Sequence, residues 1–201
     1  METSPHAMNH AHAVAVETST GIPNGKLGMW VFLASEVMFF AGLLGAYIVL
    51  RFSHPSWPGS EGHLSVPIGT LNTLLLIGSS VTIVLSLAAS QRRAMGQARG
   101  WLLATILLGS GFLLIKASEY GAKFSHHILP STNVFWSCYF ALTALHALHV
   151  LGGIVFNLFV LRWMLRPSLW GRLGHRLELA GLYWHFVDVV WIFLFPLLYL
   201  L

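Results

Sequence analysis

Five long apolar runs limit what this chain can fold into more than any other feature of the sequence. The hydrocarbon core of a bilayer is about 30 Å thick, and an α-helix needs about 20 apolar residues to cross it. The runs lie at residues 27–51, 68–91, 99–122, 134–161 and 178–200. We therefore predict an all-α integral membrane protein, a bundle of five transmembrane helices.

The composition supports this class and excludes others. Apolar residues make up 56% of the 201 residues, charged residues make up 9%, and the mean hydropathy is +0.70, which is incompatible with an ordinary soluble domain. The single cysteine, Cys138, excludes a disulfide framework or a multi-thiolate metal centre within the chain. The net charge of +4 does not indicate nucleic-acid binding, because the basic residues lie between the apolar runs, where topology signals belong.

Two regions follow from this pattern: a polar N-terminal tail, residues 1–25, and a five-helix transmembrane domain, residues 26–201. The tail contains His6, His10 and His12, but we expect no metal site there, because chain termini are usually solvated and variably ordered. It also lacks the basic stretch and short apolar run of a signal peptide.

The basic residues sort unequally between the two sides of the membrane. An odd number of spans places the two termini on opposite faces, so each Lys and Arg can be assigned to one side. One side holds eight: Lys26, Arg92, Arg93, Arg99, Arg162, Arg166, Arg172 and Arg176; the other holds three: Arg51, Lys116 and Lys123. The positive-inside rule then predicts a cytoplasmic N-terminus and an outside C-terminus.

Two acidic residues, Glu36 and Asp188, lie well inside predicted spans. An acid at the centre of a membrane helix costs about 2.5–3.5 kcal/mol on insertion scales, so each must face protein or trapped water. Glu36 is a candidate for proton handling or lipid headgroup contact, and a purely structural hydrogen bond is an equal alternative. For Asp188 we expect a structural role: His185 precedes it by three residues on the same helical face and could pair with it, or the acid could bond to another helix.

Three histidines lie within the predicted spans. His146 and His149 share one face of the fourth span, and His185 lies in the fifth. A bis-histidine haem needs ligands on facing helices, and a copper site needs about three converging ligands. We therefore expect no metal or redox cofactor in this chain and assign these histidines to a structural polar network.

Other residues suggest how the helices end and pack. Lys116, Glu119 and Lys123 lie at the end of the third span, where we expect the long side chains to extend to the interface. Glu119 is also a candidate for the structural polar network. Gly42 and Gly45 are expected to allow a close helix approach, and Gly152 with Gly153 a packing contact.

Several segments together carry a resemblance to a known family. They read KLGMWVFLASEVMFFAG, LNTLLLIGSSVT, KASEYGAKF, FALTALHALHVLGG and ELAGLYWHFVDVVWIFLF, in this order. Taken together they resemble subunit III of haem-copper terminal oxidases, the cytochrome c oxidase subunit 3 family, in a short five-helix form. The resemblance covers about Lys26 to Leu201.

The resemblance implies an accessory subunit without a catalytic or redox centre of its own, in a bacterial cytoplasmic (inner) membrane complex that reduces oxygen to water and pumps protons. The haems and copper would lie in partner subunits, with subunit I in direct contact and subunit II nearby. The chain would stabilise subunit I, bind phospholipid and support proton uptake. Glu36 matches the buried acid of the family, and Arg162 lies within about one position of a basic residue that contacts lipid headgroups.

The resemblance also leaves alternatives. Full-length members have seven spans, with two N-terminal helices beyond a lipid-filled cleft, whereas this chain resembles the five-helix bundle alone. Ser35-Glu36-Val37 and Leu71-Asn72-Thr73 are similar to the cytochrome c oxidase group. The five-span form with a His-containing tail resembles the quinol oxidase group, and a protein associated with nitric oxide reductase is a further possibility.

Hypotheses from other classes are a small proton-coupled transporter, suggested by Glu36 and Asp188, and a structural assembly factor. The spans lack the matched Pro or Gly interruptions typical of transporters, apart from Pro196 near the end.

Overall fold

Five long α-helices account for most of the residues that the computed structural model describes, which are 23–59 and 64–200. They are α1 (Asn24–Ser53), α2 (Val66–Gln91), α3 (Met95–Ser125), α4 (Val134–Met164) and α5 (Leu173–Phe195). A 3₁₀ segment, η1 (Pro167–Arg172), precedes α5, and a π-helical segment, η2 (Pro196–Leu200), follows it. There is no strand in these ranges, and each helix is long and apolar enough to cross a membrane.

The predicted all-α membrane fold is therefore confirmed. Each of the five helical segments contains its predicted apolar run and extends past it by up to a few residues, and α5 reaches its predicted end through η2. Polar and charged residues continue the helices beyond the apolar runs, because a helix satisfies its own backbone hydrogen bonds at the membrane surface as well as inside it. The predicted tail with His6, His10 and His12 lies outside the described residues, apart from residues 23–25.

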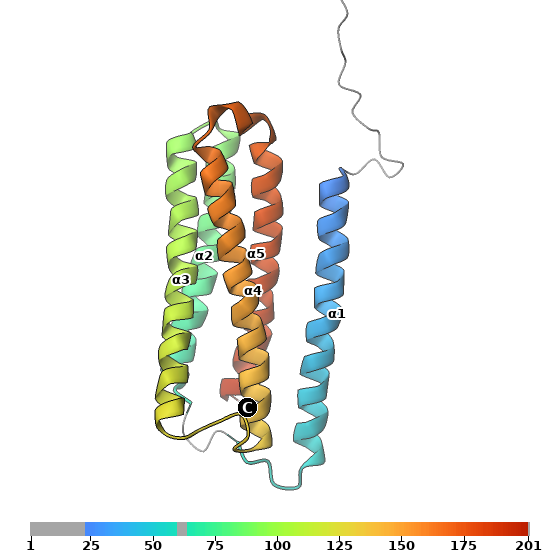
Figure 1. Ribbon diagram of the computed structural model, residues 1–201. Helices are drawn as coiled ribbons and strands as arrows, with labels where there is room; N and C mark the ends of the chain where they lie inside the picture. The colour runs from blue at the N-terminus through green and yellow to red at the C-terminus, as the bar shows by residue number, and fades with distance from the viewer. Residues whose placement is uncertain (1–22, 60–63, 201) are drawn as a thin grey trace, which may run out of the picture.

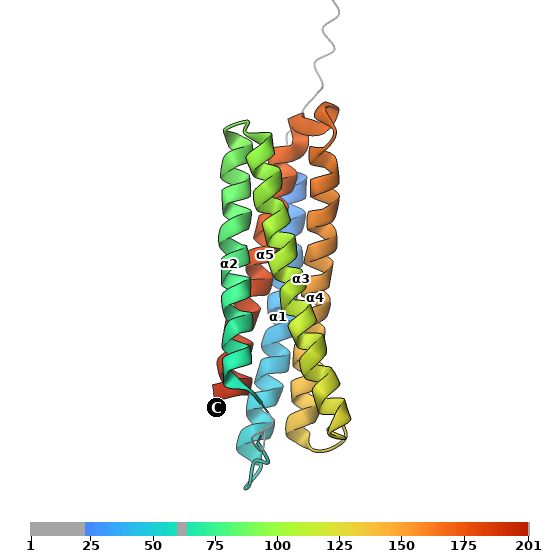
Figure 2. The same cartoon turned by 90° about the vertical axis from the view of Figure 1, so that its left-hand side faces the viewer.

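The helices α2 to α5 form one bundle, and α1 lies beside it next to α4 and α5 (Figures 1 and 2). The start of α1, the α2–α3 turn and the α4–α5 connection lie at one end of the molecule, and the end of η2 lies at the other (Figure 1). The end with the α2–α3 turn carries the eight Lys and Arg residues that were assigned to one side of the membrane; we call it the basic end. The side of the membrane that this end faces stays a prediction.

The contact of α1 with the bundle is a narrow stripe. Its three buried residues, Leu33, Phe40 and Tyr47, recur every seven positions, whereas α4 buries thirteen residues. Such a stripe follows one face of a helix of 3.6 residues per turn. The expected close approach at Gly42 and Gly45 is wrong within this chain, since a Cβ added at either glycine would meet nothing within 4 Å.

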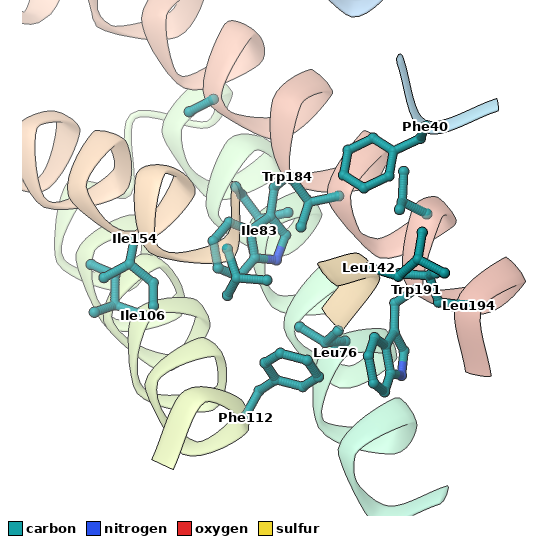
Figure 3. Close-up of a cluster of buried hydrophobic side chains, with 14 of the residues drawn as sticks. Phe40, Leu76, Ile83, Ile106, Phe112, Leu142, Ile154, Trp184, Trp191 and Leu194 are labelled. Atoms are coloured by element: carbon teal, nitrogen blue, oxygen red, sulfur yellow. The ribbon is translucent and has the colours of Figure 1, made fainter. Parts of the chain in front are cut away.

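Trp184 of α5 joins the four helices of the bundle. Its side chain is fully buried, and its indole Nε1 donates a hydrogen bond to Ser79 Oγ of α2 at 2.9 Å. A Cβ added at Gly109 of α3 would lie 2.6 Å from the indole, and one added at Gly153 of α4 would lie 2.8 Å from it. The packing role predicted for Gly153 is confirmed. Figure 3 shows Trp184 and Trp191 among the buried side chains of the neighbouring helices.

Pro196 changes the geometry at the end of α5. Proline has no backbone N–H and its ring crowds the preceding turn, so the regular hydrogen-bond ladder cannot continue through it. The chain continues as the wider π-helical turn of η2, in which Leu198 and Tyr199 are buried. This turn directs Tyr199 into the bundle, where its hydroxyl contacts Lys116 and Glu119 of α3.

The Trp184 contact predicts the effect of a single added methyl group. Gly153→Ala should lower the free energy of unfolding by about 1–3 kcal/mol, because the buried indole has no room to move away. Thermal unfolding of the purified chain in detergent, followed by circular dichroism, measures this change. Gly121→Ala on α3 is the matched control, since its Cβ would meet nothing within 4 Å. Equal unfolding temperatures for the two variants would contradict the packing contact.

Candidate functional site

Glu36 of α1 and His149 of α4 form a polar contact between helices. Glu36 Oε2 lies 2.9 Å from His149 Nε2, and both side chains are less than one fifth exposed. The Phe40 ring approaches the imidazole edge-on, with 5.0 Å between ring centroids. The contact therefore lies in an apolar seam, where hydrogen bonds face little competition from water.

The other ring nitrogen of His149 determines how many protons the pair carries. His149 Nδ1 lies 2.7 Å from the Leu145 carbonyl oxygen, and a carbonyl can only accept, so Nδ1 carries a hydrogen. The contact between Nε2 and Glu36 then needs one further proton, either on the imidazole or on the carboxyl group. The pair can therefore hold one proton in two arrangements, imidazolium with carboxylate or neutral imidazole with carboxylic acid.

Tyr183 of α5 completes this junction. Its hydroxyl donates to the backbone oxygen of His149 at 3.0 Å, so the site joins α1, α4 and α5. Sequence reasoning selected Glu36 and His149 separately and missed both their pairing and Tyr183. Spacing within one helix carries no information about which residue of another helix lies at the same depth. Tyr183 lies in the YWHFVDVVW segment, which carries part of the family resemblance, and this is the one signal in the sequence that could have pointed to it.

The predicted pair of His185 and Asp188 is not formed. His185 Nδ1 instead lies 2.5 Å from Ser80 Oγ of α2. Both Asp188 carboxyl oxygens are buried without a hydrogen-bond partner among the described residues, although the Ser80 hydroxyl is a neighbour. Three-residue spacing brings two side chains to one helix face, but the imidazole turns to the hydroxyl on the facing helix. Among the described residues, the Ser80 hydroxyl of α2 is therefore the polar neighbour of Asp188, and the His185 imidazole is not.

His146 and His149 point in different directions. The His146 side chain is completely buried between the rings of Phe112 and Trp191, with centroid distances of 5.5 and 5.1 Å, while His149 faces α1. Neither His146 ring nitrogen has a hydrogen-bond partner within the described ranges. Among all the residues that the structure describes, no three His, Cys, Asp or Glu side chains come close enough together to hold a metal ion.

Lys116 and Glu119 form a buried ion pair on α3. Lys116 Nζ lies 2.7 Å from Glu119 Oε2, and the two side chains are 4% and 5% exposed. The Tyr199 hydroxyl accepts a hydrogen bond from Lys116 and lies 3.2 Å from Glu119 Oε2, and the Tyr139 hydroxyl lies 3.4 Å from Lys116 Nζ. The expected extension of these side chains to the interface is wrong, because the aromatic residues of α4 and η2 cover them.

Arg162 lies far from the Glu36–His149 pair. It is exposed in the last turn of α4, thirteen residues beyond His149, which corresponds to about 20 Å along the helix. At the same end Lys26 Nζ of α1 lies 2.5 Å from Glu178 Oε1 of α5, and the Arg176 guanidinium lies 3.8 Å from the centroid of the Trp163 ring. Glu36, the candidate for proton uptake, and Arg162, the candidate for lipid contact, therefore belong to two separate sites.

An apolar groove of about 300 Å³ lies between α1 and α5. It begins one residue after Glu36 on α1. Its lining consists of Val37, Phe40, Ala41, Leu44, Phe186, Val189, Val190 and Phe193.

Fold and site together define a small polytopic membrane protein whose buried polar side chains connect its helices. A family model described as cytochrome c oxidase subunit III matches residues 4–201. The chain is 40% identical over 193 residues to a cytochrome c oxidase subunit 3 of Thermostichus vulcanus, covering 94% of both chains. It is 37% identical over 177 residues to a protein of the same name from Corynebacterium diphtheriae, covering 87% of this chain and 86% of the relative.

A further relative carries a different name. The chain is 30% identical over 196 residues to cytochrome bo(3) ubiquinol oxidase subunit 3 of Pseudomonas aeruginosa, covering 98% of this chain and 92% of that protein. The chain belongs to the cytochrome c oxidase subunit III family. It is accordingly a subunit III of the haem-copper oxidase type.

The proton count of the Glu36–His149 pair predicts how substitutions of Glu36 differ. Glu36→Gln should keep the contact, because the amide N–H can donate to a neutral Nε2. Glu36→Leu leaves Nε2 without a partner and should cost about 1–3 kcal/mol of stability. Thermal unfolding of the two variants, each combined with His149→Leu in a double-mutant cycle, measures the coupling. A coupling near zero for Glu36 and His149 would contradict the contact.

The buried ion pair predicts a non-additive effect. Lys116→Met should destabilise the chain by about 3–5 kcal/mol, because it strands the Glu119 carboxylate in the bundle. The double variant Lys116→Met with Glu119→Leu should recover most of this loss, since it removes both charges. Chemical unfolding in mixed micelles compares the wild-type chain, the two single variants Lys116→Met and Glu119→Leu, and the double variant. If the double variant were as unstable as Lys116→Met plus a separate loss for Glu119→Leu, the pair would not be the cause.

Proposed function

We propose that the chain is the non-redox accessory subunit of a proton-pumping terminal oxidase that takes electrons from cytochrome c and reduces oxygen to water. The observation that carries this proposal is the family match over residues 4–201, which includes all five helices. Cytochrome c is favoured because relatives named cytochrome c oxidase subunit 3 reach 40% and 37% identity. Relatives named ubiquinol or quinol oxidase subunit 3 reach 30%, and a quinol donor is the second candidate.

The proposed complex supplies the parts that this chain does not carry. Subunit I, holding the haems and copper, is the direct partner, subunit II is nearby, and phospholipids fill the remaining apolar surface. The exposed apolar side chains of α1, such as Met38 and Phe52, support a covering of lipid or partner chain. The proposed location is the bacterial cytoplasmic membrane, with the basic end of the bundle in the cytoplasm.

Within this complex the Glu36–His149 pair is the proposed proton-handling group. It holds one proton that can occupy either partner, and it lies on α1, which has few other contacts with the bundle. Arg162 at the basic end is the proposed contact for lipid headgroups, supported by its exposure in the last turn of α4. The chain thereby stabilises subunit I during turnover and supports proton uptake.

Purification in a mild detergent tests the proposal. A tagged chain should co-purify with haem absorbance and with larger membrane subunits, and the isolated complex should oxidise reduced cytochrome c faster than a quinol. Faster quinol oxidation would support the second candidate. A chain that purifies without haem, and that alone moves protons across vesicle membranes, would instead be a transporter, and the oxidase proposal would be abandoned.

A further inference from the structure

The helix faces that meet around Trp184 meet again two helical turns further from the basic end. Trp184 of α5 packs against Gly109 of α3 and Gly153 of α4, and it bonds to Ser79 of α2. Seven residues correspond to about two turns of a helix, so the same faces meet one heptad away. The residues at these positions, which we call the polar layer, are Asn72 of α2, Lys116 of α3, His146 of α4 and Trp191 of α5.

Contacts within the polar layer agree with this register. The centroid of the Trp191 ring system lies 4.8 Å from Lys116 Nζ and 5.1 Å from the centroid of the His146 ring. Trp191 Nε1 donates to the hydroxyl of Thr73, which follows Asn72 on α2. The four residues of the layer are at most 3% exposed, so the bundle shields all of them from the surrounding lipid.

Two members of the polar layer lack hydrogen-bond partners. Both ring nitrogens of His146 and both polar atoms of the Asn72 amide are buried without a partner among the described residues. These are four polar atoms at one level of the bundle, contributed by α4 and α2. Buried polar atoms are costly when they stay unpaired, so the layer needs a hydrogen-bonding ligand.

The other two members of the layer cannot supply the missing bonds. The ammonium group of Lys116 has three N–H groups, and they already bind Glu119, Tyr199 and Tyr139. The Trp191 indole has one N–H, which is used in its bond to α2. The partner of the histidine and the asparagine must therefore come from elsewhere.

A direct bond between Asn72 and His146 does not satisfy the layer. The helices α2 and α4 each pack on both α3 and α5, so they lie at opposite corners of the bundle (Figures 1 and 2). Adjacent helix axes are about 8–10 Å apart, which makes the diagonal about 11–14 Å. Even one direct bond would leave one ring nitrogen and one amide atom without a partner.

The unpaired atoms define the chemistry of the ligand. A neutral imidazole offers one donor and one acceptor, and the amide of Asn72 offers both as well. Lys116 and Glu119 already neutralise each other, so the layer has no net charge for an ion to balance. A small neutral molecule that both donates and accepts hydrogen bonds fits all four atoms.

We propose that the polar layer binds internal water, which bridges His146 of α4 to Asn72 of α2 across the centre of the bundle. A buried water typically makes about three hydrogen bonds to polar groups that have no other partner, and the layer supplies four such atoms. The water connects two helices at opposite corners and fixes their relative depth. The inference concerns this chain alone and does not rest on its place in an oxidase.

X-ray radiolysis of the unmodified full chain in lipid nanodiscs tests the site. A short pulse converts water into hydroxyl radicals, which oxidise the side chains beside that water before they diffuse away. Trp184 is the control within the same helix, because both tryptophans are at most 1% exposed. We expect Trp191 to be oxidised several-fold faster than Trp184, as located by tandem mass spectrometry. Equal oxidation of the two tryptophans, whether slow or fast, would overturn the proposal.

Substitution of the two unpaired residues provides the second measurement. Asn72→Leu and His146→Leu should each slow the oxidation of Trp191 to the rate of Trp184 and lower the unfolding temperature, because each removes part of the water site. Asn157→Leu, which replaces another buried asparagine of α4 outside the layer, is the control and should leave Trp191 oxidation unchanged.

Two results with these variants would count against the water. One is unchanged oxidation of Trp191 in His146→Leu. The other is a higher unfolding temperature for both single variants, since apolar replacement stabilises a core only where the polar atoms had no ligand. If the variants failed to fold by circular dichroism, the oxidation of the unmodified chain would decide.

Discussion

The exclusion of water from the bilayer interior is the constraint on which the polar contacts of this chain depend. A polar group inside the hydrocarbon layer must find its partner within the protein, and many partners here lie on another helix. Trp191 Nε1 donates to Thr73 Oγ1 at 3.0 Å, and the hydroxyls of Tyr120 and Thr143 lie 2.5 Å apart. Each such contact sets the depth of one helix against another, which apolar packing alone specifies weakly.

Size complementarity supplies the rest of the specificity. Lipid tails are as apolar as leucine, so burial of apolar surface does not by itself drive membrane helices together. Close fit between large and small side chains does, through many dispersion contacts. The indole of Trp184 between Gly109 and Gly153 is the closest fit of this kind, and its N–H bond to Ser79 links the packing to the polar contacts.

The helices could be predicted from the sequence because their signal is local: about 20 apolar residues in a row imply a span wherever the rest of the chain lies. The contacts between helices could not, because they depend on rotation and depth. His185 and Asp188 share a face, yet a hydroxyl of α2 binds the imidazole. Lys116 lies near a span end, yet the π-helical turn after Pro196 brings Tyr199 over it. Glu36 could be predicted as a site residue because an acidic residue inside a membrane span is unusual. Its partner His149 could not, because the pairing depends on how α1 docks against α4.

The narrow stripe by which α1 contacts the bundle has a consequence for biosynthesis. Ribosomes deliver helices in chain order, so of the five helices α1 reaches the bilayer before α4 and α5, the helices beside it. Glu36 therefore waits through the synthesis of 113 residues before His149 exists. During this interval the acid resides in the membrane or at the translocation machinery without its native partner. Docking of α1 is thus a late step of assembly, completed after the other four helices are in place.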